Sequence, residues 1–231
     1  MLPTLTIFGW TFSTYWMMFV FGIAGMAVLC CLRAKQYRLT CSKAIVFTLL
    51  LSVVGLLGTK LLFIAENIEI VMSEGLSLAG QSFFGALFLI PPSVALYSRL
   101  FRLRASQGVD LCAAPVIFIL MCMRMGCLMS GCCGGIFIGT FQVPAQFLEA
   151  LGDAIILTVL LETEKRNKFI GRLYPLLMVL YGSMRFFLEF VRDTEKNLLG
   201  FSRGQLYSVI AIVVGVAWLK MKGRKQHEIR K

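Results

Sequence analysis

The sequence has few charged residues and a single histidine. Only 15% of its 231 residues are Asp, Glu, Lys or Arg, against about 25% in soluble domains, and 58% are hydrophobic. It also lacks a long polar linker, a low-complexity segment and an internal repeat of fixed period. These absences argue against a soluble or multi-domain protein. They predict one polytopic integral membrane domain covering residues 1–231.

The N-terminal segment lacks the two marks of a cleaved signal peptide. Its first residues, MLPTLTIFGW, contain neither a basic n-region nor an A-x-A-like cleavage site. We therefore expect the first apolar segment to be retained as a membrane span.

The eight cysteines lack the usual spacing of a metal site. The run Cys127-x4-Cys132-Cys133 has neither the C-x2-C form nor a nearby histidine, because the single histidine, His227, lies in the basic C-terminal tail. Five cysteines fall within or at the ends of apolar runs, where thiols behave as small hydrophobic groups: Cys30, Cys31, Cys112, Cys122 and Cys127. Disulfide frameworks belong to small secreted domains. The sequence thus predicts free thiols, no metal and no cofactor.

Seven apolar segments approach the length of about 20 residues that a membrane-spanning helix needs. They are residues 6–32, 44–65, 76–98, 111–130, 145–161, 173–191 and 204–220. The sequence therefore predicts an all-α fold of seven transmembrane helices. Because Pro91 and Pro92 cannot continue a regular helix, we expect the third helix to be kinked or broken.

Basic residues concentrate in alternate connections between these segments. Connections 33–43, 99–110 and 162–172 and the C-terminal tail hold four, three, four and six lysines and arginines, 17 in all, against three on the other side. The positive-inside rule then places the N-terminus outside and the C-terminus in the cytoplasm. The net charge of +11 is explained by topology and by contact with anionic lipid, so no nucleic-acid partner is needed.

Six charged residues interrupt the predicted spans: Lys60, Arg124, Glu149, Asp153, Arg185 and Glu189. A charge at mid-bilayer costs about 3 kcal/mol on insertion scales, so such residues normally face the protein interior or a wet cavity. Two groups share helical faces: Gln146, Glu149 and Asp153 in one, and Arg185, Glu189 and Arg192 in the other. We expect a polar chamber, although pairing within a salt-bridged bundle is the alternative.

The arginines of this set suit a phosphate group. We expect Glu189 to neutralise either Arg185 or Arg192 and to leave the other free, with Arg124 as a third guanidinium. A guanidinium is a planar fork that matches phosphate oxygens. Several of them in an apolar chamber indicate a phospholipid head group, and the alternative is a helix face with no ligand.

Four motifs occur in order along the chain. "RMGCLMSGCCGG" is similar to R-x-G-N-F-x-N-x-E-x-x-G, "PAQFLEA" to H-P-S-Q-L-Y-E, "YGSMRFFLEFVR" to Y-G-x-x-R-F-x-x-E-F-x-R, and "RGQLYS" to M-G-Q-x-L-S. Weaker matches are Tyr15 in "FSTYWMM" and Lys60 in "GTKLLF". In this order the motifs resemble the bacterial prolipoprotein diacylglyceryl transferases along nearly the whole chain.

This resemblance implies a seven-span enzyme of the bacterial plasma (inner) membrane. It implies transfer of a diacylglyceryl group from phosphatidylglycerol to the lipobox cysteine near the signal peptide of a prolipoprotein, with release of glycerol phosphate. The catalytic candidates are Arg124, Arg185, Glu149 and Tyr15. The head-group candidates are Arg124, Arg185, Arg192, Gln146 and Lys60. The residues expected to pair or pack structurally are Glu189, Gly126 and Gly135.

Several polar residues of the family pattern are replaced. Phe84 stands at the family histidine, Cys127 and Ser130 at two asparagines, Cys132 at a glutamate and Val143 at a second histidine. Activation of the acceptor thiol could then fall to Tyr15, Glu149 or an arginine-rich environment. We expect Cys132 and Cys133 to be structural and not to carry lipid.

Three functions therefore stay open at the level of sequence. The first is transfer to a prolipoprotein thiol, and the second is an enzyme of the same fold with another donor or acceptor. The third is a catalytically silent protein that binds or moves lipid.

Overall fold

The computed structural model describes residues 4–7, 10–74, 82–101, 103–166, 171–192 and 200–228. The side chains of Ile7, Trp10, Ile70, Glu74 and residues 222–228 lie outside the described part, and so does the side chain of His227.

Each of the seven predicted spans corresponds to a helix in the described ranges. The helices are α1 (Thr14–Ala34), α2 (Cys41–Glu66), α4 (Phe83–Tyr97), α5 (Ala105–Ser130), α6 (Ala145–Lys165), α7 (Leu173–Leu188) and α8 (Arg203–Glu228). Shorter elements connect them: β1 (Thr4–Ile7), β2 (Trp10–Ser13), η1 (Lys35–Tyr37), α3 (Ile68–Glu74), η2 (Ser98–Phe101), β3 (Phe137–Ile138) and β4 (Phe141–Gln142).

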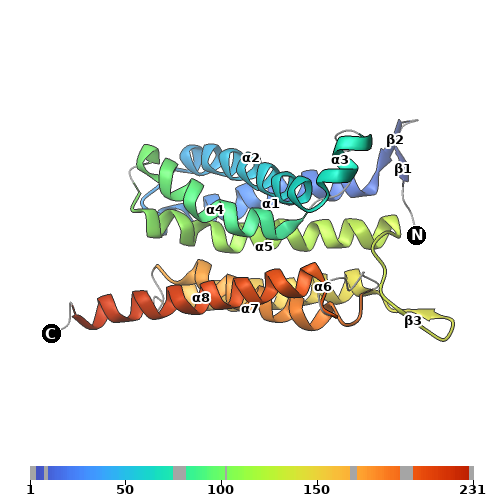
Figure 1. Ribbon diagram of the computed structural model, residues 1–231. Helices are drawn as coiled ribbons and strands as arrows, with labels where there is room; N and C mark the ends of the chain where they lie inside the picture. The colour runs from blue at the N-terminus through green and yellow to red at the C-terminus, as the bar shows by residue number, and fades with distance from the viewer. Residues whose placement is uncertain are drawn as a thin grey trace.

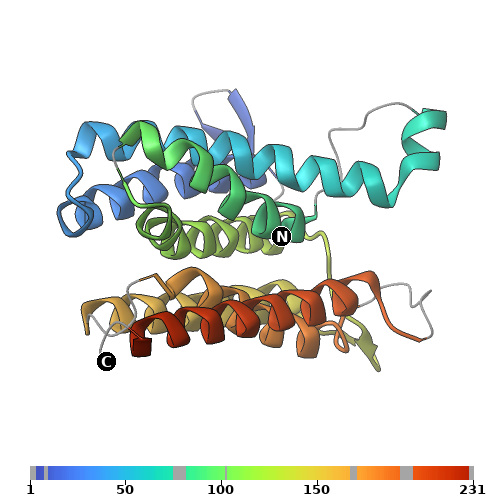
Figure 2. The same cartoon turned by 60° about the vertical axis from the view of Figure 1, so that its left-hand side comes forward.

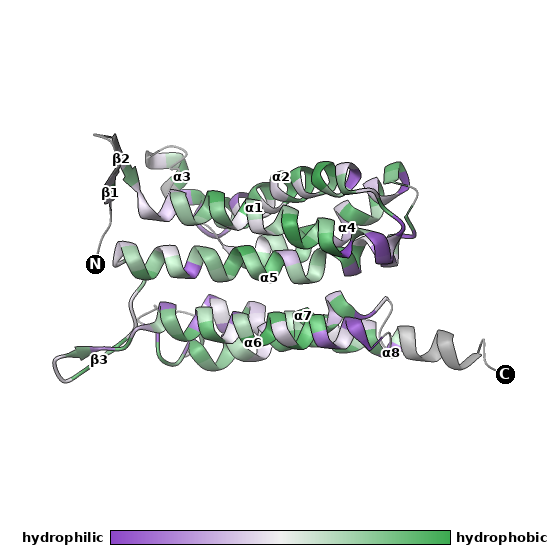
Figure 3. Cartoon of the chain, turned by 180° about the vertical axis from the view of Figure 1, so that it is seen from behind, coloured by the Kyte–Doolittle hydropathy of each residue, from purple (hydrophilic) through white to green (hydrophobic). Residues whose placement is uncertain are grey.

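Five helical segments of the described chain are long and apolar enough to cross a membrane. They are Thr14–Tyr37, Cys41–Glu66, Phe83–Phe101, Ala105–Ser130 and Arg203–Met221, while Leu173–Leu188 is apolar but shorter. Large apolar side chains such as Val20, Leu57 and Val213 are more than half exposed, and Figure 3 shows hydrophobic colour along most of the helices. These surfaces agree with a lipid environment.

The helices form two layers (Figures 1 and 2). Helices α1, α2, α4 and α5 make one layer, and α6, α7 and α8 make the other. Helix α5 lies where the layers meet and packs on α1, α4, α6 and α7. Its most apolar stretch is 61% buried, against 17–39% for the other four candidate spans. Residues on α5 can therefore contact both layers.

Two short hairpins correct the all-α prediction. Residues Thr4–Ile7 pair with Trp10–Ser13 in an antiparallel register, so the first helix begins at Thr14 and not at residue 6. Alternating threonine and apolar residues in TLTI favour a strand over a helix. A second hairpin pairs Phe137–Ile138 with Phe141–Gln142 in the connection between α5 and α6.

The third helix was predicted to be kinked or broken at its two prolines; it is continuous through them, so it is not broken. Helix α4 runs from Phe83 to Tyr97 with Pro91 and Pro92 inside. A proline at position 91 leaves the carbonyl of Leu87 without its helical donor. The Tyr174 hydroxyl of α7 donates to that carbonyl at 2.9 Å. A hydrogen bond from the second layer thus replaces the one that the proline removes.

The connection between α1 and α2 also differs from expectation. Cys31 and Cys41 form a disulfide, so the prediction of a free thiol at Cys31 is wrong. Arg38 adopts a left-handed φ of 57°, which reverses the chain between α1 and α2 and brings these cysteines together.

The sequence places Arg33 in the connection after the first span. The structure places it in the last turn of α1, where it is buried. Its guanidinium pairs with Glu164 of α6 at 2.6 Å and donates to the Leu111 carbonyl of α5 at 2.8 Å. The Tyr37 hydroxyl donates to the same carboxylate at 2.5 Å. This network joins both layers at one end of the bundle, and the candidate site lies at the other.

Candidate active site: an arginine–carboxylate cluster

Three arginines meet one glutamate between the layers. Glu149 of α6 contacts Arg124 Nε of α5 at 2.5 Å, Arg185 Nη1 of α7 at 2.9 Å and Arg192 Nη1 at 2.8 Å. The predicted convergence of Arg124, Arg185 and Glu149 from three segments is therefore confirmed. Their catalytic and head-group roles stay predictions.

Glu189, which directly follows the last residue of α7, is the second carboxylate of this cluster. Its carboxylate contacts Arg185 Nη1 at 2.8 Å and accepts a hydrogen bond from the Ser202 hydroxyl at 2.8 Å. The expectation that Glu189 would leave one of its two arginines free is wrong, since Arg185 and Arg192 both reach Glu149. Spacing along one helix did not reveal the carboxylate supplied by another.

The cluster carries a positive surplus. Three guanidinium groups form ion pairs with two carboxylates, Glu149 and Glu189, which leaves one formal positive charge among the paired groups; the Asp153 carboxyl forms none of these ion pairs and is not counted. The Arg124 and Arg192 side chains are 17% and 15% exposed, while Glu149 is 3% exposed. The surplus charge is therefore approachable through the two arginines, and the neutralising carboxylate lies behind them. An anion is the ligand that this arrangement favours.

Asp153 lies one helical turn beyond Glu149. It is buried, and neither of its carboxyl oxygens has a hydrogen-bond partner within the described part of the chain. Arg124 and Arg185 are within electrostatic range of it. The shared face predicted for Gln146, Glu149 and Asp153 is thus buried at all three positions.

Gly126 allows α1 to approach α5 closely beside Arg124. A Cβ at this position would lie 3.1 Å from Met18 Cβ and 3.3 Å from Tyr15 Cα. Tyr15 consequently lies near the cluster, where its hydroxyl is within electrostatic range of Arg124 and Cys127. A catalytic role for Tyr15 stays a prediction.

Gly135 fixes the connection between α5 and α6 to the end of α7. Its amide donates to the Val143 carbonyl at 2.9 Å, and the next amide, of Ile136, donates to the Val191 carbonyl at 2.9 Å. A Cβ on Gly135 would lie 2.6 Å from the Val191 oxygen, so no larger residue fits without movement. The Gln146 amide donates to the Cys132 carbonyl, which gives Gln146 a contact with this connection. Its head-group role stays a prediction.

Lys60 and Phe84 lie away from the ion pairs described above. The Lys60 ammonium of α2 lies 5.7 Å from the centre of the Phe63 ring, and its head-group role stays a prediction. Phe84 is buried, with its ring centre 5.7 Å from that of Tyr181 and 5.6 Å from that of Tyr207. The residue at the family-histidine position is therefore part of an aromatic core.

A group of three thiols lies beside the cluster. The sequence drew attention to this cysteine run and predicted no metal there, but it did not predict that the three thiols converge. The sulfur atoms of Cys127, Cys132 and Cys133 are all within 4.8 Å of one another. A hydrogen bond from Cys127, assisted by the guanidinium groups of Arg124 and Arg192, lowers the pKa of the Cys133 thiol to about 5. The only sequence signal was the C-x4-C-C spacing, which matches no common motif.

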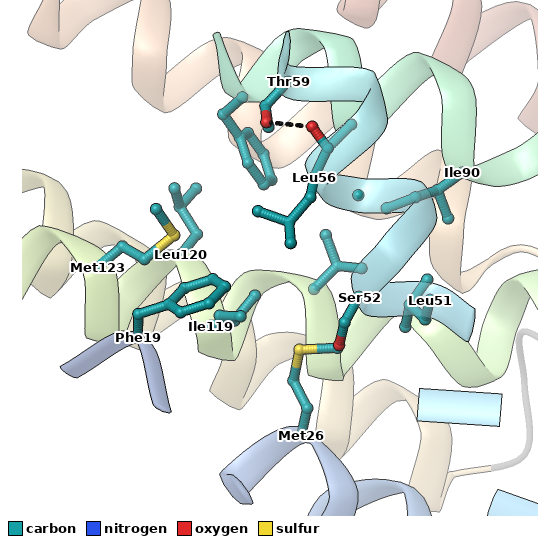
Figure 4. A pocket seen from close by; sticks show the side chains of 14 residues that line it. Phe19, Met26, Leu51, Ser52, Leu56, Thr59, Ile90, Ile119, Leu120 and Met123 are labelled. Carbon is teal, nitrogen blue, oxygen red and sulfur yellow. Dashed lines mark hydrogen bonds between the residues drawn. The ribbon is translucent and has the colours of Figure 1, made fainter. Parts of the chain in front are cut away.

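An apolar pocket lies between the helices of the first layer (Figure 4). Phe19, Met26, Leu51, Ile90 and Leu120 are among its lining residues. The Thr59 hydroxyl at its edge donates to the Leu56 carbonyl at 2.9 Å. None of the three arginines lines this pocket. The charged residues thus form an ion-pair cluster that is separate from this apolar pocket, and a polar chamber stays a prediction.

The apolar helices are those of a multi-pass membrane protein. Its polar site is the arginine–carboxylate cluster at one end of the bundle, which suits an anion. The chain belongs to the prolipoprotein diacylglyceryl transferase family, whose model matches residues 3–221. The predicted family, the class of transferase-like enzyme and the setting in the bacterial inner membrane are confirmed by this match and by the apolar helices.

Bacterial relatives match most of the chain at modest identity. The phosphatidylglycerol–prolipoprotein diacylglyceryl transferase 2 of Clostridium perfringens is 28% identical over 95% of this chain and 96% of its own length. The phosphatidylglycerol–prolipoprotein diacylglyceryl transferase of Clostridium tetani is 26% identical over 91% and 93%. That of Dehalococcoides mccartyi is 25% identical over 77% and 76%.

Proposed function

We propose that the protein transfers a diacylglyceryl group from phosphatidylglycerol to the lipobox cysteine thiol of a prolipoprotein. The observation that carries the proposal is the convergence of Arg124, Arg185 and Arg192 on Glu149 with one surplus positive charge. Phosphatidylglycerol presents one phosphate anion on an apolar body. The relatives' names supply the reaction.

The reaction needs stabilisation of a leaving phosphate. The acceptor sulfur attacks the glyceryl carbon of the lipid, and the carbon–oxygen bond to phosphate breaks. The bonding electrons leave with glycerol phosphate, whose phosphate gains negative charge. Arg124 and Arg192 are partly exposed and can donate to those oxygens, while Arg185 is held in place by Glu149 and Glu189. Preorganised donors of this kind supply much of the rate in such sites.

The lipid substrate also needs a place for its acyl chains. The apolar pocket lined by Phe19, Leu51 and Leu120 suits a hydrocarbon chain, because it offers apolar contact and few polar groups. Its helices belong to the first layer (Figure 1), and α5 carries both Leu120 of this pocket and Arg124 of the cluster. In this proposal, α5 binds the chain along its middle and the phosphate near its end.

One observation favours a second function. Phe84 is packed in an aromatic core with Tyr181 and Tyr207 and offers no group that could accept a proton. The family has a histidine at this position. The second function is that of an enzyme with another donor or acceptor, or of a silent phospholipid-binding protein, and either would use the same cationic cluster without a histidine at position 84.

Rescue of bacteria depleted of their own diacylglyceryl transferase tests the proposal. Wild type should restore growth and the lipidation of a reporter lipoprotein. The Arg124→Ala variant should fail at equal membrane abundance. Lys165→Ala is the matched control, because it removes a cation from an exposed pair with Glu162. A wild-type protein that is abundant in the membrane but rescues nothing would favour the second function.

A further inference from the structure

The three thiols beside the arginine cluster are held together by the local backbone. Helix α5 ends at Ser130, and Gly131 caps it with a left-handed φ of 73°. Cys133 is also left-handed, with φ 60°, an uncommon conformation for a residue other than glycine. The Cys132 amide donates to the Cys127 carbonyl at 3.2 Å. The reversal therefore returns Cys132 and Cys133 to the last turns of the helix that carries Cys127.

The reversed segment is also anchored from the second layer. The Gln146 side chain of α6 donates to the Cys132 carbonyl, and Gly135 pairs with Arg192 in an isolated β-bridge. The positive φ angles of Gly131 and Cys133 and the contacts with Gln146 and Arg192 hold the three thiols in place. A ligand can therefore bind them without a rearrangement of the helices. Cys132 and Cys133 are exposed, while Cys127 is buried. An ion from solution can therefore reach the three sulfurs.

We propose that Cys127, Cys132 and Cys133 bind one thiophilic divalent metal ion of the zinc class. A tetrahedral zinc ion with Zn–S bonds of about 2.3 Å holds its sulfur ligands about 3.8 Å apart. The three sulfur atoms already lie within 4.8 Å of one another. Side-chain rotations that move the sulfurs by about an ångström would bring them to the spacing of zinc ligands. The absence of a C-x2-C motif does not argue against it, since the helix cap supplies the convergence that a short loop supplies elsewhere.

The charges of the two neighbouring groups are complementary. Three thiolates and one divalent ion carry a net charge of −1, and the arginine cluster carries a surplus of +1. Arg124 and Arg192 are within electrostatic range of Cys133. Soft thiolate ligands select zinc-class ions over magnesium or calcium. The three thiols therefore favour a zinc-class ion over a harder cation.

A three-ligand site leaves a fourth position for substrate, as in catalytic zinc sites. This use rests on the proposed function. The acceptor thiol would bind there and release its proton to solvent, because a metal-bound thiol is deprotonated. Its sulfur would then form the carbon–sulfur bond to the glyceryl group as the carbon–oxygen bond to phosphate breaks. The metal would thus supply the thiol activation that Phe84 cannot.

Cobalt binding tests the metal site directly. The full chain, purified in detergent with a reductant and stripped with a chelator, is titrated with Co²⁺ and then with Zn²⁺. We expect one Co²⁺ per chain, with the charge-transfer absorption of cobalt–thiolate bonds, and loss of that absorption when Zn²⁺ displaces it. Cys133→Ser and Cys132→Ser should each weaken binding at least tenfold. Cys122→Ser, which changes a buried thiol on the same helix, is the matched control and should bind as wild type.

Three outcomes overturn the metal site. They are no cobalt–thiolate absorption in folded wild type, equal affinity in wild type and Cys133→Ser, and a disulfide within the group that persists under reductant. Transfer assays separate this result from the proposed function. Metal binding without transfer by wild type would refute the function and leave the site. Transfer that withstands chelator and Cys133→Ser would refute the site and leave the function.

Discussion

At the scale of single residues, Glu149 is the centre of the site. It is 3% exposed and contacts three arginines that belong to two other segments. Helical spacing predicted that Glu149 and Asp153 share a face and that Arg185 and Arg192 share another. It could not predict which carboxylate would meet the arginines, because the rotation of one helix against the next depends on packing along its whole length. The convergence of Cys127, Cys132 and Cys133 could not be predicted from their spacing, because it depends on a helix cap with positive φ.

Replacing Glu149 should lower the thermal stability of the protein. In Glu149→Gln, three guanidinium groups lose their shared counter-charge, and removing one partner of a buried ion pair costs about 3–5 kcal/mol. Thermal unfolding in detergent should therefore show a clear fall in Tm. Glu162→Gln, at an exposed pair with Lys165, should leave Tm nearly unchanged. A similar Tm for Glu149→Gln and wild type would show that the cluster contributes nothing to stability.

At the scale of elements, the sequence predicted where helices lie better than how they begin and end. Each of the seven segments chosen by hydropathy overlaps a helix, and five helical segments of the described chain are long and apolar enough to cross a membrane. Hydropathy extended the first helix back to residue 6, where a hairpin forms instead. The prolines predicted a kink or a break in the third helix, which is continuous because a tyrosine from another helix compensates the lost hydrogen bond at Pro91. Local rules cannot include a donor that is 87 residues away in the chain.

That compensation can be measured at Tyr174. Tyr174→Phe removes the hydroxyl that donates to the Leu87 carbonyl and leaves a buried acceptor unpaired, at a cost of about 1–3 kcal/mol. We expect a lower Tm. Tyr97→Phe is the control, because the Tyr97 hydroxyl is buried with no hydrogen-bond partner in the described structure, and its loss should be neutral or stabilising. An equal fall in both variants would contradict the compensation.

The connection after α5 should be intolerant of a side chain at Gly135. In Gly135→Ala, the new Cβ would lie 2.6 Å from the Val191 oxygen and 2.7 Å from the Val143 oxygen, so the segment must move away from α7. We expect lower stability and faster proteolysis of residues 131–144. Gly55→Ala has nothing within 4 Å of its new Cβ and improves helix propensity. Proteolysis of Gly135→Ala at the wild-type rate would argue against a fixed connection.

At the scale of the whole molecule, two layers of helices meet at α5 (Figure 1). Each end of the bundle holds a polar network, one around Arg33 and Glu164 and the other around Glu149. Neither the layers nor the Arg33–Glu164 pair could be predicted, because they depend on contacts between segments far apart in sequence. The charge bias of the connections could be predicted, because it is read along the chain. Seven crossings with the N-terminus outside and the C-terminus in the cytoplasm remain our proposal for the topology.

Reporter fusions test that topology. Fusions within 35–40 and within 68–74 should report the cytoplasm and the outside, respectively, because basic residues collect in the first connection and acidic ones in the second. The arginine cluster would then lie toward the outer surface, the side on which the proposed prolipoprotein acceptor would be reached. The same side for both fusions would contradict seven crossings.

Transfer of label from phosphatidylglycerol to a lipobox peptide, in bilayers containing the purified chain, tests the central claim most directly. We predict a thioether-linked diacylglyceryl group on the peptide cysteine with wild type and with Lys165→Ala. Arg124→Ala should reduce the rate at least about a hundredfold, as loss of one charge-stabilising donor does elsewhere. Arg124→Lys should recover only part of it, since a point charge does not replace the planar fork. No label on the thiol with folded wild type, or full transfer by Arg124→Ala, would contradict the account.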